Sequence, residues 1–197
     1  RANSGIYNSS DDLIGYWKME DASGTTLTDV SGNSKDGAIS GASWTTGVES
    51  TSYDNTPSGP KDGGNALSFD GSNDYVEIGS NLTLLNQPQK VTISAWVNLD
   101  KLTNHSAGEV NVFGGARGGE WRMAYNQNDQ KFVFGVNSGN TWYNASVAAT
   151  TNWQHLVGVY DRPNGKVIIY NNGSLSDENG NVPNSNLKEA NLMWAIG

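Results

Sequence analysis

The chain has 197 residues, a formal net charge of −8 and no cysteine. Its length suffices for one sizeable core, and its acidic balance argues against a nucleic-acid partner, because phosphate binding needs a basic surface. The absence of cysteine excludes thiol catalysis and cysteine-ligated zinc, and no segment approaches the roughly 20 apolar residues of a membrane-spanning helix.

Glycine-rich and polar stretches separate short apolar runs along the whole chain, which has 24 glycines. This pattern predicts many short strands joined by tight turns. Residues 1–12 are polar and are predicted to be a linker or a processed N-terminal segment, followed by one domain at 13–197. The first strand is predicted at 13–19 and a short one at 38–44, before a long polar loop at 45–64.

Two patterns dominate the middle of the chain. At 66–78, apolar runs flank Gly71-Ser72-Asn73-Asp74, which predicts strand, turn, strand. Asp70 and Asp74, with Asn73 between them, are a second candidate metal cluster, but a role in shaping the turn is favoured. At 91–99, apolar and polar residues alternate cleanly, so one side of a strand is expected to face the core. Residues 82–85 could form one short helical turn.

Further strands are predicted in the second half of the chain, at 110–114, 120–126, 131–137 and 142–147. Two more, at 153–160 and 166–171, flank Asn164-Gly165, a strong hairpin signal. A loop is predicted at 173–186 and a last strand at 191–196. Strands at this spacing, with no helical periodicity, predict an all-β fold, either a two-sheet antiparallel sandwich or a barrel.

Four segments together resemble the laminin-G-like domains of the concanavalin A-like lectin/glucanase superfamily, of the bacterial extracellular type. They are 15–21, 29–37, Phe69-Asp70-Gly71 and 153–173. The strand at 93–97 fits as well, and the segments follow the family's order across 13–197. The resemblance implies a jelly roll of one concave and one convex antiparallel sheet, used as a carbohydrate-binding or adhesion module of a larger exported protein.

The resemblance also implies a closing strand that has no counterpart after Ala195-Ile196-Gly197. Family members usually continue into a final strand that pairs with the first. Without it, the strand at 13–19 would have an unpaired edge, which is an aggregation liability. We therefore expect an incomplete piece of a larger product. Either the remainder lies on a separate, processed or disordered segment, or another chain or domain supplies the strand in trans.

Similar domains often hold a structural calcium ion in the loop corresponding to 29–37. The resemblance carries Asp29 and Asn33 over as ligands, with Gly37 as a carbonyl donor and Asp36 beside them. Calcium takes about six to eight oxygen ligands, which a tight oxygen-rich loop can offer. The alternative is that Asp29 and Asn33 only shape turns through hydrogen bonds from side chain to backbone.

Sugar binding requires an exposed aromatic platform and planar polar groups, because aromatic faces stack on a pyranose and amides or carboxylates bond pairs of hydroxyls. The candidates lie between 104 and 144, with Glu109 and His105 near them. They are Trp121, Arg122, Tyr125, Asn126, Trp142 and Tyr143. For Trp121 the alternative is an inward position on a strand. Trp17, Trp96 and Trp153 are expected to be structural.

Catalysis finds little support in the sequence. Glucanases of this superfamily carry closely alternating acidic residues on one strand, and no Glu-x-Asp-x-x-Glu pattern occurs here. Asp177 and Glu178 are adjacent in a predicted loop, Glu120 is isolated, and His155 lies where the family commonly has a structural histidine. No Ser-His-Asp arrangement can be read from the spacing.

The sequence therefore predicts a non-catalytic, lectin-like carbohydrate-binding or adhesion module, secreted or at the cell surface, with structural Ca²⁺. Its expected partners are a polysaccharide or glycoconjugate and other domains of the parent protein, with no nucleic acid and no membrane insertion. The alternative is a structural or protein-interaction spacer domain of a surface protein with no sugar site.

Overall fold

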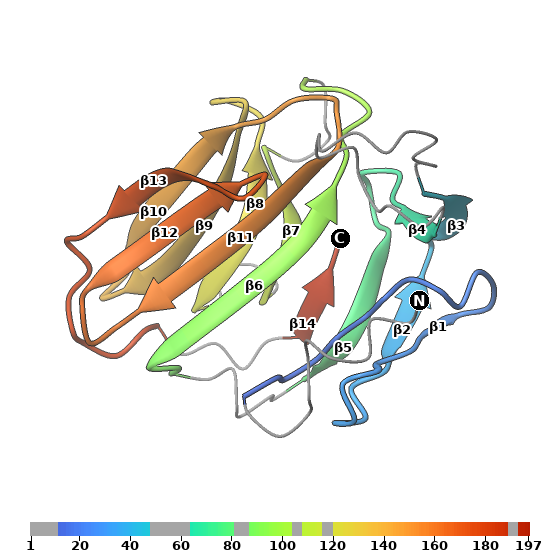
Figure 1. Ribbon diagram of the computed structural model, residues 1–197, viewed down its shortest axis with the longest axis horizontal. Helices are drawn as coiled ribbons and strands as arrows, with labels where there is room; N and C mark the ends of the chain where they lie inside the picture. The colour runs from blue at the N-terminus through green and yellow to red at the C-terminus, as the bar shows by residue number, and fades with distance from the viewer. Residues whose placement is uncertain (1–11, 48–63, 81–86, 104–107, 116–119, 189–192) are drawn as a thin grey trace.

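The computed structural model describes residues 12–47, 64–80, 87–103, 108–115, 120–188 and 193–197. These residues build two antiparallel sheets that lie face to face, with a two-stranded sheet at one end (Figure 1). The described residues contain strands and turns but no helix, and so no helix that could cross a membrane. The all-β, two-sheet antiparallel sandwich predicted from the sequence is confirmed.

The larger sheet has eight strands in the order β1-β2-β5-β14-β7-β8-β9-β10. In that order their bounds are Thr26–Leu27, Gly37–Ser40, Tyr75–Ser80, Met193–Ile196, Glu109–Gly115, Trp121–Asn126, Lys131–Ser138 and Thr141–Ala148. The smaller sheet has the order β13-β12-β11-β6. Its bounds are Ser174–Asn179, Lys166–Asn171, Gln154–Asp161 and Lys90–Val97. The third sheet pairs β3 (Ser43–Thr46) with β4 (Asn65–Ser68).

The core lies between the two main sheets, where alternate residues of each strand turn inward. From the smaller sheet, Leu156, Val167 and Ile169 are fully buried. From the larger sheet, Phe134 packs against Gly158 of β11, where an added Cβ would lie 2.4 Å from the Phe134 ring. Glycine at 158 therefore lets the two sheets approach closely at this point.

An aromatic cluster holds the middle of the larger sheet together. Trp121 on β8 and Trp194 on β14 have ring centroids 4.8 Å apart, and Phe113 on β7 lies 5.7 Å from Trp121 and 6.0 Å from Trp194. All three are buried. Residues far apart in the sequence thus form one packed unit, which fixes the inner face of β8.

Three boundaries predicted from the sequence are wrong. The expected strand at 13–19 forms only an isolated bridge, between Trp17 and Asp29. The expected strand at 38–44 is split into β2 and β3 at Gly41, whose φ is 79°. The expected loop at 173–186 contains β13. The helical turn expected at 82–85 lies outside the described residues.

The pattern at 66–78 does form two strands, β4 and β5, but they do not pair with each other. β4 pairs with β3, whereas β5 pairs with β2 and β14 in the larger sheet. Both aspartates shape the turn between these strands. Asp74 Oδ2 accepts the Asp70 N–H at 2.9 Å, and Asp70 Oδ1 accepts the Ser72 N–H at 2.8 Å. The segment therefore connects two sheets rather than forming a hairpin.

Candidate functional site

Strand alternation places Arg122, Asn137 and Trp142 together on the outer face of the larger sheet. Trp121 lies opposite Val136 in the core, so Arg122, the next residue, points the other way. Arg122 lies opposite Gly135 on β9, and two residues further along β9, Asn137 lies opposite Trp142 of β10. Neighbours at these positions are close enough for long side chains to touch.

The same alternation removes Trp121 and Tyr125 from the expected sugar platform. Each is 1% exposed and belongs to the core. The Tyr125 hydroxyl donates to the Leu102 carbonyl, and burial raises the pKa of Tyr125. Tyr143 lies half-buried against the core on the inner face. Of the four expected aromatic residues, only Trp142 lies on the outer face.

Arg122 connects the aromatic ring to a carboxylate. Its guanidinium carbon Cζ lies 3.6 Å from the centroid of the Trp142 ring, and its Nη2 donates to Glu109 Oε1 at 2.7 Å. The Arg122 side chain is 15% exposed and that of Glu109 36%. A partly desolvated cation over a tryptophan face contributes about 1–2 kcal/mol, so the ring and the guanidinium hold each other in place.

Two polar atoms at this position have no hydrogen-bond partner among the described residues. They are Arg122 Nε and Asn137 Oδ1, both buried. Leaving a buried donor or acceptor unpaired costs about 1–3 kcal/mol, so both atoms are ready to bond to a ligand or to water. Asn137 is 4% exposed and was not among the residues expected from the sequence. Its outward position on β9, opposite Trp142, is the feature from which Asn137 could have been predicted as a site residue.

Two further asparagines border this group. Asn144 lies over Gly135, because a Cβ added to Gly135 would meet Asn144 Oδ1 at 1.9 Å. Asn126 is on the same face, but its Oδ1 accepts the Asn128 N–H at 3.0 Å and shapes the turn after β8. We call Glu109, Arg122, Asn137, Trp142 and Asn144 the Arg122 site. His105, expected nearby, lies outside the described residues.

Hydrogen bonds organise the loop at 29–37, where a calcium ion is expected. Asp29 Oδ1 accepts the N–H groups of Tyr16 and Ser31 at 2.9 Å each. Its Oδ2 accepts the Ser31 hydroxyl at 2.8 Å and the Lys35 N–H at 2.9 Å. Burial acts to raise the pKa of Asp29, but the bonds from Tyr16, Lys35 and Ser31 together outweigh it and hold the pKa below its ordinary value.

The other expected ligands are engaged in the same way. Asn33 Nδ2 donates to the carbonyl of Leu13 at 2.5 Å, and Asp36 Oδ1 accepts the Asp29 N–H at 2.8 Å. Gly37 belongs to β2, where an added Cβ would meet Val76. Among the described residues, no group of three or more His, Asp and Glu side chains could hold a metal ion. The hydrogen bonds of this loop match the turn-shaping alternative, and calcium binding by the loop stays a prediction.

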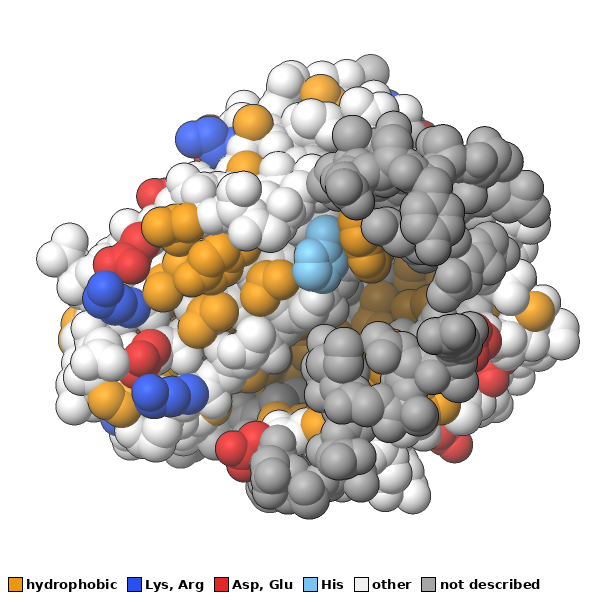
Figure 2. Space-filling model, viewed as in Figure 1, with side chains coloured by type: hydrophobic (Ala, Val, Ile, Leu, Met, Phe, Trp, Pro, Cys, Tyr) orange, Lys and Arg blue, Asp and Glu red, His pale blue; other side chains and the backbone are white. Residues whose placement is uncertain are grey.

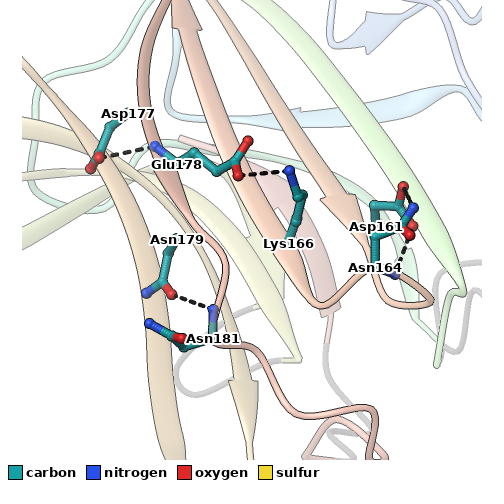
Figure 3. Close-up of polar contacts among 7 residues, drawn as sticks. All are labelled: Asp161, Asn164, Lys166, Asp177, Glu178, Asn179 and Asn181. Atoms are coloured by element: carbon teal, nitrogen blue, oxygen red, sulfur yellow. Dashed lines mark hydrogen bonds and ion pairs between the residues drawn. The ribbon is translucent and has the colours of Figure 1, made fainter.

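The acidic residues considered for catalysis are each engaged separately (Figure 3). Asp177 Oδ1 accepts the Glu178 N–H at 2.9 Å, and Glu178 Oε1 pairs with Lys166 Nζ at 2.8 Å. Asp177 Oδ2 accepts the Ser146 N–H of β10 at 2.9 Å. Glu120 is buried and accepts the Gln87 N–H at 2.7 Å. These carboxylates tie strands together rather than facing one another across a cleft.

A serine–histidine contact, which the sequence spacing did not reveal, lies on the outer face of the smaller sheet. Ser94 Oγ and His155 Nε2 are 2.8 Å apart, and the His155 ring packs 5.0 Å from that of Trp96. Burial lowers the pKa of His155. No carboxylate among the described residues bonds to the ring, so the pair lacks the third member of a catalytic triad.

The same outer face carries an apolar patch. It appears in Figure 2 as hydrophobic side chains gathered over β11, β12 and β13 beside the histidine. Alternation along these strands assigns the patch to Val157, Val159, Ile168, Tyr170 and Leu175. Leu175 is 60% exposed. The smaller sheet is thus apolar on both faces, unlike an ordinary surface sheet.

The two facing antiparallel sheets, with aromatic and hydrogen-bonding side chains on an outer face, define a lectin-type β sandwich. The chain belongs to the concanavalin A-like lectin/glucanases superfamily, for which a laminin G family model matches residues 70–197. The family resemblance inferred from the sequence segments is confirmed. No curated protein sequence matches the chain significantly.

Solved structures share the fold at low sequence identity. The botulinum neurotoxin serotype C1 binding domain aligns with a TM-score of 0.63 and 14% identity, covering 96% of this chain and 43% of that one. The binding domain of botulinum neurotoxin DC in complex with SialylT gives 0.59 and 13%, covering 95% and 44%. The same domain in complex with rat synaptotagmin II gives 0.54 and 13%, covering 89% and 41%. The chain therefore spans less than half of these proteins.

Proposed function

We propose that this chain is a non-catalytic module that binds a glycan at the Arg122 site. The observation that carries the proposal is the Arg122–Trp142 contact beside two buried polar atoms, Arg122 Nε and Asn137 Oδ1, which have no partner in the described part of the chain. An aromatic surface next to a few fixed donors and acceptors is the usual composition of a small-molecule or sugar site. One face of the Trp142 ring is covered by Arg122, so the ligand would use its other face or its edge.

Family membership and the solved structures support a binding role. One neighbouring structure is named as a complex with SialylT and another as a complex with rat synaptotagmin II. Binding partners of these two kinds, a glycoconjugate and a receptor protein, are consistent with a recognition module in an exported or surface-attached parent protein. Secretion or surface display of the parent is part of this proposal.

An enzymatic role is disfavoured by the placement of the carboxylates. Glycoside hydrolysis uses two carboxyl groups flanking one bond, about 5–9.5 Å apart. In the Arg122 site, Glu109 is the one carboxylate among the described residues, and it is paired with Arg122. We therefore infer binding without turnover.

A glycan array probed with the purified chain, followed by calorimetry on the strongest hit, tests the proposal. Trp142→Ala is expected to weaken binding about tenfold or more, equivalent to 1.4 kcal/mol or more. Trp96→Ala is the matched control, because Trp96 is a partly exposed tryptophan on the other sheet. The proposal fails if no glycan binds the unaltered chain, or if Trp96→Ala weakens binding as much as Trp142→Ala does.

The apolar patch on the smaller sheet favours a second candidate, a structural or protein-interaction domain. Its occupant would be an adjoining domain of the parent protein, since the patch is broad, uncharged at its centre and bordered by the Lys166–Glu178 and Lys90–Asp161 ion pairs. Paired substitutions of Ile168 and Leu175 by serine would leave glycan binding intact under the first candidate. Under the second, they would release the adjoining domain while no glycan binds.

A further inference from the structure

The charges of the residues in the Arg122 site indicate which chemical class of glycan it would bind. We propose that the site selects an uncharged saccharide, with Arg122 acting as a hydrogen-bond donor rather than as a positive charge for an acidic sugar. This inference rests on the proposed glycan-binding function and adds the chemical class of the ligand.

The charge of Arg122 is already compensated inside the site. Its Nη2 donates to Glu109 Oε1 at 2.7 Å, and its guanidinium carbon lies 3.6 Å from the centroid of the Trp142 ring. A carboxylate or sulfate on a sugar would have to compete with Glu109, which is held at the same guanidinium. An incoming anion would also approach a chain with a formal net charge of −8.

The other side chains of the site are neutral amides. Asn137 lies across the ladder from Trp142, and Asn144 lies over Gly135. On β9, Lys131 lies four residues before Gly135 and therefore roughly 13 Å away along the strand. Lys188 is exposed and lies beside the site, since its N–H donates to the Asn137 carbonyl at 2.8 Å. The charge argument therefore rests on the Arg122–Glu109 pair and on the net charge of the chain.

The two unpartnered atoms match a hydroxyl and mismatch an anion. Arg122 Nε can only donate and Asn137 Oδ1 can only accept. A sugar hydroxyl both accepts and donates, so hydroxyls suit both kinds of atom. A carboxylate or sulfate oxygen accepts but cannot donate, so it would leave Asn137 Oδ1 unpaired and facing a second acceptor. The two atoms thus favour a hydroxyl over an anionic group at this position, and selection against the anionic group of an acidic sugar rests on the Arg122–Glu109 pair.

The test uses an array of neutral oligosaccharides, each printed beside sialylated, uronate-containing and sulfated counterparts. Neutral glycans are expected to bind, and their acidic counterparts to bind about tenfold more weakly or not at all. Calorimetry on the strongest neutral hit is expected to give affinities within about twofold between 50 and 500 mM NaCl, since no net ion pair forms. A preference for acidic glycans that weakens steeply with salt would overturn this inference while leaving the proposed function standing. No glycan binding at all would overturn the proposed function itself.

Two variants sharpen the assignment. Arg122→Lys keeps the charge but removes Nε and the flat stacking surface, so it is expected to lower affinity for the neutral hit about tenfold. Glu109→Gln frees the guanidinium charge and is expected to raise binding of the acidic counterparts relative to the neutral hit. Circular dichroism and Tm confirm that each variant is folded. An Arg122→Lys protein that is folded and binds the neutral hit normally would contradict the donor role.

Discussion

Replacing Asp29 by alanine tests whether the loop at 29–37 is held by hydrogen bonds rather than by a metal ion. The carboxylate accepts four hydrogen bonds, from the N–H groups of Tyr16, Ser31 and Lys35 and from the Ser31 hydroxyl. In Asp29→Ala all four donors lose their acceptor. Asp29→Asn keeps one acceptor oxygen and is expected to retain part of the stabilisation.

The expected loss follows from the number of bonds. Hydrogen bonds to a charged group contribute about 1.5–3 kcal/mol each, but donors that water can reach recover part of this. Counting about 1 kcal/mol net per bond gives a loss of about 4 kcal/mol for Asp29→Ala. For a chain of this size, about 2–4 °C of Tm corresponds to 1 kcal/mol, so Tm should fall by about 8–16 °C. Asp29→Asn should lose about half of that.

Thermal and urea denaturation at pH 7 measure this loss, with Asp70→Ala as the control. Asp70 is an exposed carboxylate that accepts one N–H, from Ser72, and its removal should cost less than about 1 kcal/mol. Adding calcium or a chelator should leave the Tm of the unaltered chain unchanged, because both Asp29 oxygens are already used. A calcium-dependent rise in Tm of several degrees, or an Asp29→Ala loss no larger than that of Asp70→Ala, would refute the reasoning.

The stability lost in Asp29→Ala is expected to depend on pH. The hydrogen bonds lower the pKa of folded Asp29, so the folded protein releases this proton more readily than the unfolded chain. The stabilisation is complete above the unfolded value of about 3.9 and is lost as pH falls through the lowered folded value. The difference in stability between the unaltered chain and Asp29→Ala should therefore be constant near neutrality and shrink below about pH 4.

Three further outcomes are expected. Gly158→Ala should lower stability by about 2–3 kcal/mol in urea denaturation, since its Cβ would lie 2.4 Å from the Phe134 ring; an unchanged midpoint would contradict the close approach of the sheets. Burial lowers the pKa of folded His155, so stability should fall as pH drops below about 6.5. In His155→Gln, Tm should change less between pH 7 and 5 than in the unaltered chain. An equal change of Tm with pH in both proteins would count against this role of His155. Gly135→Ala should displace Asn144 and weaken glycan binding, with little change in Tm because Asn144 is exposed; full retention of affinity would exclude Asn144 from the site.

Local alternation allowed most strands to be predicted from the sequence, because inward and outward positions of one strand are encoded by neighbouring residues. The run at 91–97 and the hairpin at Asn164-Gly165 are found in the structure as β6 and as β11 with β12. Strand partners are not encoded in this way. β4 and β5 are adjacent in sequence but belong to different sheets, since long-range packing decides their pairing.

The polar strand β13 shows a second limit. Its residues, Ser174–Asn179, are almost all exposed and carry no apolar alternation, so the sequence reads as loop. The strand is held at the sheet edge by its ladder with β12 and by the bond from the Ser146 N–H of β10 to Asp177. Such a strand owes its conformation to its neighbours rather than to its own residues.

The candidate site was half predictable for a related reason. Choosing aromatic and polar residues by composition selected Arg122 and Trp142 correctly for the outer face, but it also selected Trp121 and Tyr125, which face inward. Successive residues of a strand point to opposite faces, so alternation along 121–126 alone assigns Trp121 and Tyr125 to one face and Arg122 to the other. Alternation along one strand cannot show that Asn137 Oδ1 is unpaired among the described residues, because its pairing depends on which side chains of β8, β9 and β10 reach it.

β8 links the stability of the fold to the geometry of the Arg122 site. Its inner residue Trp121 packs against both Phe113 and Trp194, and this packing helps to set the register of the strand. The register determines that Arg122 lies opposite Gly135, from which it reaches both Trp142 and Glu109. A slip of one residue would exchange the two faces, placing arginine in the core and tryptophan outside. The position of the guanidinium is therefore set before any ligand arrives, which lowers the entropy lost on binding.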